Sequence, residues 1–129
     1  METNSAVRPT GIFEIERDGD TLVVTPQTDL REFEYQHIES GAREILDLLG
    51  GGTVKNLVLD FAKTDYYGST ALGFFVKLWK RVRSRHGHLA FCNVSAHELE
   101  ILRVTNMGSL WPVCPSRQEA LEAVRRGAA

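Results

Sequence analysis

Hydrophobic and polar residues alternate over residues 13–17, and a β-branched, apolar run follows over residues 21–25. Asp18-Gly19-Asp20 lies between the two runs and is typical of a tight turn. A period of two places successive side chains on opposite faces of a strand. The pattern therefore predicts an N-terminal β-hairpin.

A helical repeat of hydrophobic positions follows Pro26 and extends from about Leu30 to Leu49. Apolar side chains recur there mainly at intervals of three and four residues, and Gly50-Gly51-Gly52 ends the repeat. We expect the first helix in this segment. Its core-facing stripe comprises Phe33, Ile38, Ala42, Ile45, Leu46 and Leu49.

Residues 55–61 form a short apolar run, which is typical of a strand buried on both faces of a parallel sheet. A second helical repeat covers residues 69–85 and ends in basic residues before Gly87, which suits the helix dipole and a C-terminal cap. These segments are expected to form the central strand and the second helix. The apolar stripe of that helix comprises Leu72, Phe75, Val76, Trp79 and Val82.

The rest of the chain continues the alternation of strands and helices. Residues 88–94 and 111–114 are predicted to be strands, and each is followed by a Ser-x-x-Glu capping-box sequence, at residues 95–98 and 116–119, that opens a helix. Crossovers between parallel strands are right-handed. The predicted fold class is therefore α/β, a mostly parallel β-sheet with an N-terminal β-hairpin and about four helices.

Length and composition indicate one globular domain. The chain has 129 residues, of which 43% are hydrophobic and 25% charged, enough for a packed core. We expect a single domain over residues 1–129, with an ordered core over about residues 11–126. The formal net charge of -2 lacks the positive excess of a phosphate-binding surface, so no direct nucleic-acid partner is expected.

Nothing in the pattern predicts export or membrane insertion. The N-terminal segment has Glu2 and no apolar run, and the apolar stretch over residues 71–76 is far below the ~20 residues that cross a bilayer. We therefore expect a cytoplasmic location. In that reducing compartment Cys92 and Cys114 are expected to be free, structural thiols.

The sequence departs from the motifs of common catalytic sites. Residues 68–73 carry the two glycines of a P-loop, but Phe74 and Phe75 stand where the phosphate-binding lysine and the Mg²⁺-binding hydroxyl belong. Ser69 is not flanked by the glycines of a hydrolase nucleophile elbow. The two histidines within residues 86–88 lack further metal ligands nearby. We expect no enzyme activity, no cofactor and no metal.

The junction between the central strand and the second helix, residues 59–73, carries a family motif. It resembles the STAS domain of anti-sigma factor antagonists, whose motif reads apolar-apolar-Asp-apolar, six or so residues, then Asp-Ser-Ser-Gly-Leu-Gly. On this pattern Asp60 matches the first aspartate, Ser69 the serine that is phosphorylated in the family, and Thr70 the second serine. The resemblance extends from about residue 13 to residue 124 and implies the STAS fold.

The sequence differs from the family pattern in three places. Gly68 replaces the aspartate before the phosphorylated serine, and Ala71 replaces the glycine after the second hydroxyl. In the loop after the predicted hairpin, residues 26–29 keep only the final Asp29 of the family's Gly-x-Leu-Asp sequence. These differences bear on recognition by the kinase more than on the fold, and they leave Thr70 open as the alternative acceptor.

Ser69 suits a phosphate switch on physical grounds as well. A serine in the first turn of a helix can cap it, and a phosphate of roughly -1.5 to -2 charge is stabilised at the positive end of the helix dipole. Because the chain has no nucleotide site, a separate kinase must supply the phosphate. The resemblance implies that this partner is an anti-sigma factor that is also a serine kinase. It implies an antagonist that binds the kinase, frees a sigma factor, and is inactivated by phosphorylation at Ser69.

The partner surface is expected around this switch, because aromatic and arginine side chains near such a site are the usual interface anchors. Tyr66 and Tyr67 are neighbours in an extended segment, so one is expected to point inward and the other outward. Phe75 and Trp79 share the apolar stripe and are expected in the core. The candidate partner-binding residues are Asp29, Tyr67, Gly68, Ser69, Thr70, Phe74 and Leu78.

Two other functional hypotheses remain open at this point. The first is a phosphorylation-independent STAS interaction module of a transporter or a signalling scaffold. The second is an enzyme with a small-molecule pocket at the carboxyl ends of the strands, where Asp29, Asp65, Tyr66 and Ser69 would converge. The sequence leaves the oligomeric state open.

Overall fold

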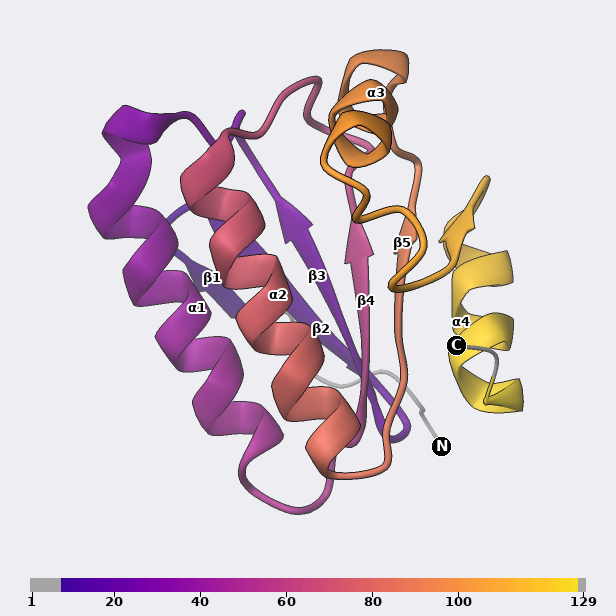
Figure 1. Ribbon diagram of the computed structural model, residues 1–129. Helices are drawn as coiled ribbons and strands as arrows, with labels where there is room; N and C mark the ends of the chain where they lie inside the picture. The colour runs from indigo at the N-terminus through magenta and orange to yellow at the C-terminus, as the bar shows by residue number, and fades with distance from the viewer. Residues whose placement is uncertain (1–7, 128–129) are drawn as a thin grey trace.

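The computed structural model of the protein describes residues 8–127, which form one six-stranded sheet with helices on both faces (Figure 1). The strands cross the sheet in chain order, from β1 to β6. Their bounds are β1 Arg8–Thr10, β2 Phe13–Asp18, β3 Thr21–Pro26, β4 Asn56–Asp60, β5 Leu89–Cys92 and β6 Val113–Cys114. The helices are η1, a 3-10 helix over Glu32–Glu34, then α1 Tyr35–Leu49, α2 Ser69–Ser84, α3 Ala96–Val104 and α4 Arg117–Arg126.

The sheet is antiparallel at its beginning and parallel afterwards. Strands β1, β2 and β3 pair antiparallel, whereas β3, β4, β5 and β6 pair parallel. The β2–β3 turn contains Gly19 at a φ of 64°, a conformation that glycine adopts without steric cost. The structure confirms the predicted α/β class and the N-terminal hairpin, and it adds β1, which the sequence pattern did not predict.

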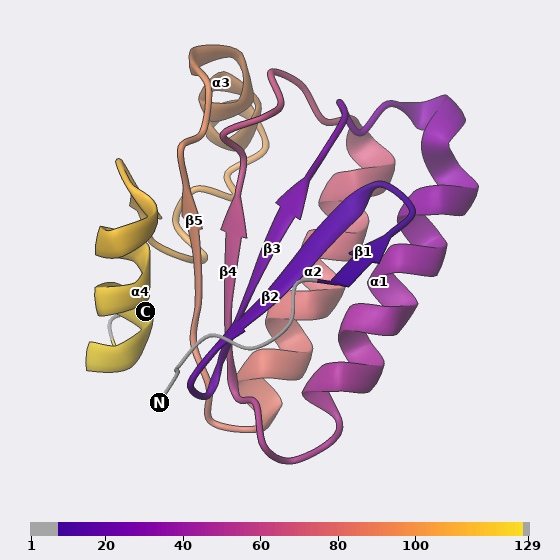
Figure 2. The ribbon, with the colours of Figure 1, turned by 180° about the vertical axis from the view of Figure 1, so that it is seen from behind.

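Side chains alternate between the two faces of the sheet, as the period of a strand requires. On one face Leu57 and Leu59 belong to the main core, which α1 and α2 cover (Figure 1). On the other face Val58 packs with Ala120 and Val124 of α4, which lies beside β5 (Figure 2). The central strand is therefore buried from both sides, which explains its continuous apolar sequence.

The first helix begins later than the hydrophobic repeat predicted. It was expected from about Leu30, but Leu30 forms a parallel bridge with Tyr67. The amide of Leu30 donates to the Tyr66 carbonyl at 3.1 Å, and the Leu30 carbonyl accepts from the Gly68 amide at 2.9 Å. Because these bonds hold Leu30 extended, α1 begins only at Tyr35. Phe33, predicted to face the core, is 81% exposed, so that prediction is wrong.

In α2 one assignment is confirmed and one is corrected. Phe75 is buried, as predicted, and Trp79 is half-buried with its ring centroid 6.3 Å from that of Trp111. Leu78 was expected on the outside of the helix, but it is buried within the main core. The apolar face of α2 is wide enough to include Leu78 because α2 packs against α1 and shares the main core with the strand residues Leu57 and Leu59.

The two cysteines lie on neighbouring parallel strands. Cys92 and Cys114 are register partners on β5 and β6, and both are free thiols. Burial raises the pKa of Cys92 to about 12, which keeps this thiol protonated.

The capping box at Ser95 and Glu98 forms in full, whereas at residues 116–119 only the bond from the Glu119 amide to the Ser116 hydroxyl is present. Over residues 8–127, no helix has the length and hydrophobicity to traverse a bilayer.

Candidate functional site

The candidate site lies where the chain passes from β4 into α2, at the carboxyl ends of β3 and β4 (Figure 1). Ser69 is the first residue of α2 and is exposed, and Thr70 beside it is half-buried. The residue at the N-cap is Gly68, which has no side chain to cap the helix. Another part of the chain must therefore satisfy the first amides of α2.

That group is the carboxylate of Glu32, which η1 places over the N-terminus of α2. Its Oε2 atom accepts hydrogen bonds from the Ser69 hydroxyl at 3.1 Å and from the Thr70 amide at 3.3 Å. The Thr70 hydroxyl donates to the other oxygen, Oε1. These bonds, above all that from the Thr70 side chain, hold the pKa of Glu32 below its usual value. Ser69 therefore donates to a capping carboxylate and is not itself the cap.

Gly68 makes room for this carboxylate. A Cβ atom at position 68 would lie 2.3 Å from Oε2 of Glu32, far inside van der Waals contact. Gly68 has φ and ψ of -99° and -173°, an extended conformation open to any residue, so a side chain here would cause no backbone strain but would require the Glu32 carboxylate to shift. The acidic residue that the motif would have at position 68 is absent, and a carboxylate reaches the same place from Glu32.

Glu32 was missed by sequence reasoning. It lies 37 residues before Ser69, within a segment whose apolar spacing predicted a regular helix. No motif connects it to the switch, because the contact depends on how η1 meets α2. The one available signal is the loss of the aspartate at position 68, which implied that the acidic character of the site had to come from elsewhere.

Asp29 ties the two loops of the site together. Its Oδ1 atom accepts from the Asp65 amide at 2.9 Å, and its Oδ2 atom pairs with Arg31 at 3.2 Å. The Arg31 guanidinium lies 5.0 Å from the ring centroid of Tyr66. Asp29 and Asp65 thus lie together, as the enzyme hypothesis would require, but the contact is made by the backbone amide of Asp65 and is structural.

Helix α3 anchors the loop before Ser69 from the other side. Glu98 is fully buried, and its carboxylate accepts from the Thr64 hydroxyl at 2.5 Å and from the Ser95 amide at 3.0 Å. The Ser95 hydroxyl donates to the Asp65 carbonyl at 3.0 Å. Burial is the main reason that the pKa of Glu98 is raised. The loop that precedes Ser69 is therefore attached to both Asp29 and α3, which fixes the position at which α2 begins.

The structure corrects two of the candidate partner-binding residues. Tyr67 is fully buried, and its hydroxyl donates to the Glu98 carbonyl at 2.9 Å. Leu78 is in the core. Tyr66 is half-buried, so one of the two tyrosines points inward and the other toward solvent, as predicted. Because neither Tyr67 nor Leu78 presents its side chain at the surface, neither can anchor a partner in this conformation.

Three aromatic side chains of η1, α1 and α2 are partly or largely exposed near the N-terminal ends of the two helices. Phe74 is half-buried, with its ring centroid 6.4 Å from that of Tyr35 and the Lys77 ammonium 5.4 Å from its centre. Tyr35 is 48% exposed and Phe33 is 81% exposed. We call Phe33, Tyr35 and Phe74 the aromatic surface. It is continuous with Glu32, which precedes Phe33 in the chain and contacts α2.

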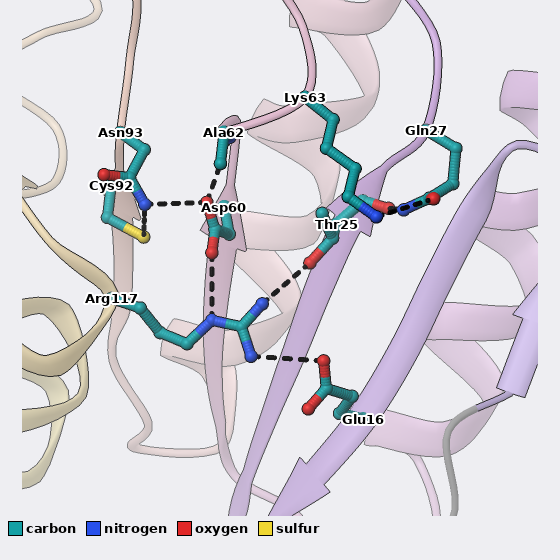
Figure 3. A network of polar contacts seen from close by, with 9 residues as sticks. All are labelled: Glu16, Thr25, Gln27, Asp60, Ala62, Lys63, Cys92, Asn93 and Arg117. Atoms are coloured by element: carbon teal, nitrogen blue, oxygen red, sulfur yellow. Dashed lines mark hydrogen bonds and ion pairs between the residues drawn. The ribbon is translucent and has the colours of Figure 1, made fainter.

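Asp60, which matched the first aspartate of the motif, has a structural role on the α4 face of the sheet. Its carboxylate accepts from the Ala62 amide at 3.0 Å, from the Asn93 side chain at 2.9 Å and from Nε of Arg117 at 2.9 Å (Figure 3). Arg117 reaches from α4 across the sheet and also contacts Glu16 at 3.1 Å (Figure 3). The aspartate therefore joins the ends of β4 and β5 to α4.

The chemistry available at the site is that of an exposed hydroxyl beside a carboxylate. Within residues 8–127, no three His, Cys, Asp or Glu side chains are grouped so as to hold a metal ion. The Ser69 hydroxyl donates to Glu32, whose lowered pKa makes it a weak base. Glu32 is therefore poorly suited to act as a general base that would make Ser69 a catalytic nucleophile of this chain.

Comparison with known proteins identifies the family. Residues 13–120 match the STAS domain. The chain belongs to the STAS domain family. It is 30% identical over 71 residues to BtrV of Bordetella bronchiseptica, which is described as a putative anti-sigma factor antagonist. That alignment covers 55% of this chain and 61% of BtrV, so the chain matches about three fifths of the length of this relative.

Solved structures share the STAS fold. An anti-sigma factor antagonist (STAS) domain protein from Planctomyces limnophilus is 27% identical, with a TM-score of 0.76 over 88% of this chain and 97% of that chain. The Bacillus cell fate determinant SpoIIAA in its phosphorylated form is 18% identical, with a TM-score of 0.65 over 88% of this chain and 99% of that chain. These similarities confirm the fold that the sequence motif predicted.

Proposed function

We propose that this STAS domain is an anti-sigma factor antagonist. In this proposal it binds an anti-sigma factor that is also a serine kinase, releases the sigma factor, and is inactivated when the kinase phosphorylates Ser69. The observation that carries the proposal is the exposed Ser69 hydroxyl at the first residue of α2, next to the aromatic surface. No catalysis is required of this chain, because the partner supplies the nucleotide and the reaction.

The chemistry of the surface supports a switch. A phosphate on Ser69 would add roughly -1.5 to -2 charge beside the Glu32 carboxylate, at an exposed position. The fold would survive, while a partner that docks over Ser69 would meet a strongly negative patch. The existence of SpoIIAA in a phosphorylated form supports the view that a domain of this fold can carry the modification.

Ser69 is a better acceptor than Thr70. Ser69 is exposed and its hydroxyl makes one hydrogen bond, to Glu32. Thr70 is half-buried, and Glu32 accepts hydrogen bonds from both its hydroxyl and its amide. Phosphorylation of Thr70 would therefore disrupt more of the native contacts.

Asp29 and Gly68 contribute to the proposed partner site by shaping it. Asp29 holds the loop before Ser69, and Gly68 leaves room for the Glu32 carboxylate.

The test uses wild type, Ser69→Ala and Thr70→Ala with ATP and the candidate anti-sigma kinase from the same cells. We expect wild type and Thr70→Ala to incorporate phosphate and Ser69→Ala to incorporate none. Ser69→Ala should bind the kinase constitutively, and phosphorylation of wild type should weaken binding by about 5- to 150-fold. Phosphate incorporation into Ser69→Ala at the wild-type rate would contradict the assignment of Ser69. Equal affinity of modified and unmodified protein would favour a phosphorylation-independent interaction module.

A further inference from the structure

The attachment of η1 to the rest of the molecule depends on few contacts. None of its residues is buried. Glu34 bonds locally, with its amide donating to the Arg31 carbonyl at 2.9 Å and its carboxylate meeting Nδ1 of His37 at 2.8 Å. Glu32 alone among the three residues of η1 hydrogen-bonds α2 through its side chain. The backbone bonds of Leu30 hold the chain before η1, and α1 continues it, so the bonds of Glu32 to Ser69 and Thr70 are what fix η1 itself against α2 between these two anchors.

We propose that Glu32 is a positioning residue that couples the state of Ser69 to the aromatic surface. In the unmodified protein its carboxylate holds the Ser69 and Thr70 hydroxyls and keeps η1 against α2. A phosphate on Ser69 displaces that carboxylate, so η1 and Phe33 change position with it. The inference rests on the proposed phosphorylation of Ser69 and adds a structural consequence to it.

The chemistry of the modified hydroxyl favours this displacement, because it removes one donor to Glu32 and adds a like charge beside it. In the transfer, the Ser69 oxygen forms a bond to the γ-phosphorus of ATP, the bond from that phosphorus to ADP breaks, and the hydroxyl proton is lost. The donor that Glu32 Oε2 accepts from, now at 3.1 Å, then no longer exists. The phosphate oxygens that replace it are negatively charged, as Glu32 is. They compete with Glu32 for the hydrogen bond that the Thr70 amide donates.

Gly68 supplies an independent argument and a second way to displace Glu32. The room that Glu32 occupies exists only because position 68 has no Cβ atom, which would lie 2.3 Å from Oε2. Alanine fits the extended backbone of Gly68 but not the carboxylate. Gly68→Ala is therefore expected to displace Glu32 by volume alone, without any added charge, and to reproduce the effect of the phosphate on η1.

Glu32 also lies next to the side chains whose position matters to a partner. Phe33 follows it directly and is 81% exposed, and Tyr35, the first residue of α1, has its ring centroid 6.4 Å from that of Phe74. A shift of η1 would change how these rings are presented. The switch would then alter both the charge and the shape of one continuous surface.

The test is NMR of the full chain in five forms: wild type, a form with phosphoserine placed at position 69 during translation, Glu32→Gln, Gly68→Ala and the control Glu34→Gln. Glu34 is the matched control, because it lies on η1 and its carboxylate contacts His37 rather than α2. We expect the first three altered forms to shift the Phe33 and Tyr35 amide resonances in a common direction. Glu34→Gln should leave the Thr70 amide unchanged.

A pH titration separates positioning from general structure. In wild type the Thr70 amide resonance should move as the Glu32 carboxylate titrates below its usual pKa, and this transition should be absent in Glu32→Gln. The proposal is overturned if phosphoserine at position 69 leaves the Phe33 and Tyr35 resonances at their wild-type positions. It is also overturned if the Thr70 amide resonance of Glu32→Gln still moves with pH as it does in wild type. If Gly68→Ala does not fold, phosphoserine and Glu32→Gln decide the matter.

The outcome is independent of the partner. Because the phosphoserine is introduced without a kinase, the coupling is tested even if no kinase modifies Ser69 in the cell. Conversely, phosphorylation and release of the kinase with unchanged η1 resonances would leave the proposed function in place and overturn the role of Glu32.

Discussion

At the scale of single residues, two glutamates support the site, and their surroundings shift their pKa values in opposite directions. Glu32 is exposed and its hydrogen bonds lower its pKa, whereas Glu98 is fully buried and its pKa is raised. Glu32 holds the N-terminus of α2, and Glu98 holds the loop that leads to it. The same residue type therefore supports the site from both sides, one at the surface and one in the interior.

The buried Glu98 predicts a pH dependence of stability. Because its pKa is higher in the folded than in the unfolded chain, the folded protein binds more protons between the two values. This group stabilises the fold most below the usual glutamate pKa, and that contribution is lost as the pH rises through the raised pKa. Urea unfolding of wild type and Glu98→Gln should thus show Glu98→Gln gaining relative stability as the pH rises through that window. Glu100→Gln, exposed and on the same helix, is the control and should show no such gain.

At the scale of elements, α4 is attached to the sheet by one polar network and one apolar patch. Arg117 joins it to Asp60 and Glu16, and Ala120 and Val124 pack on the sheet. The Asp60 side chain is only 5% exposed, whereas that of Arg117 is 36% exposed. The ion pair is therefore buried at the aspartate and partly solvated at the arginine.

Arg117→Met is expected to lower the free energy of unfolding by about 2–3 kcal/mol, because it leaves the buried Asp60 carboxylate without its counter-charge. Asp60 retains the bonds from Ala62 and Asn93, so the loss stays below that of an isolated buried charge. Denaturant unfolding measures the effect. Arg125 is on the same helix and forms a more exposed ion pair with Asp18 of β2. Arg125→Met should therefore lower the free energy of unfolding by less than about 1 kcal/mol. Equal losses in the two variants would contradict this account of the network.

At the scale of the whole molecule, the two faces of the sheet have separate tasks. The face covered by α1 and α2 (Figure 1) carries the main core, and Ser69 is the first residue of α2. The face that meets α4 carries the smaller core and the Asp60 network (Figure 3). A change at the switch can therefore alter the surface without disturbing the packing of α4.

The aromatic surface predicts a partner variant that separates binding from folding. Phe33→Ala removes a ring that is 81% exposed, so the unfolding temperature should remain within a degree or two of wild type, an approximate bound for a surface substitution. Affinity for the anti-sigma kinase should fall by about 1–2 kcal/mol, as for an interface anchor. Calorimetric titration measures the affinity. Val104→Ala, 61% exposed at the end of α3, is the control and should bind like wild type. Wild-type affinity of Phe33→Ala would exclude Phe33 from the interface.

Local pattern was sufficient for most elements, because strand and helix periods are properties of neighbouring residues. The alternation over residues 13–17, the apolar run of β4 and the box at Ser95 and Glu98 each predicted what the structure contains. The position of Ser69 at the start of α2 was also evident, since a change from strand to helix is a local event. The family motif added the STAS fold to these elements.

Other features depended on contacts between distant segments, which no local period encodes. Phe33 had helical spacing, but the bridge between Leu30 and Tyr67 kept its segment out of α1. Leu78 and Tyr67 were assigned to the surface until the packing of α2 and α3 placed them inside. The sequence by itself determined most of the elements, the family and the position of Ser69 at the start of α2. Only the tertiary structure decided that Glu32 meets Ser69, because that contact joins residues 37 apart through the approach of η1 to α2.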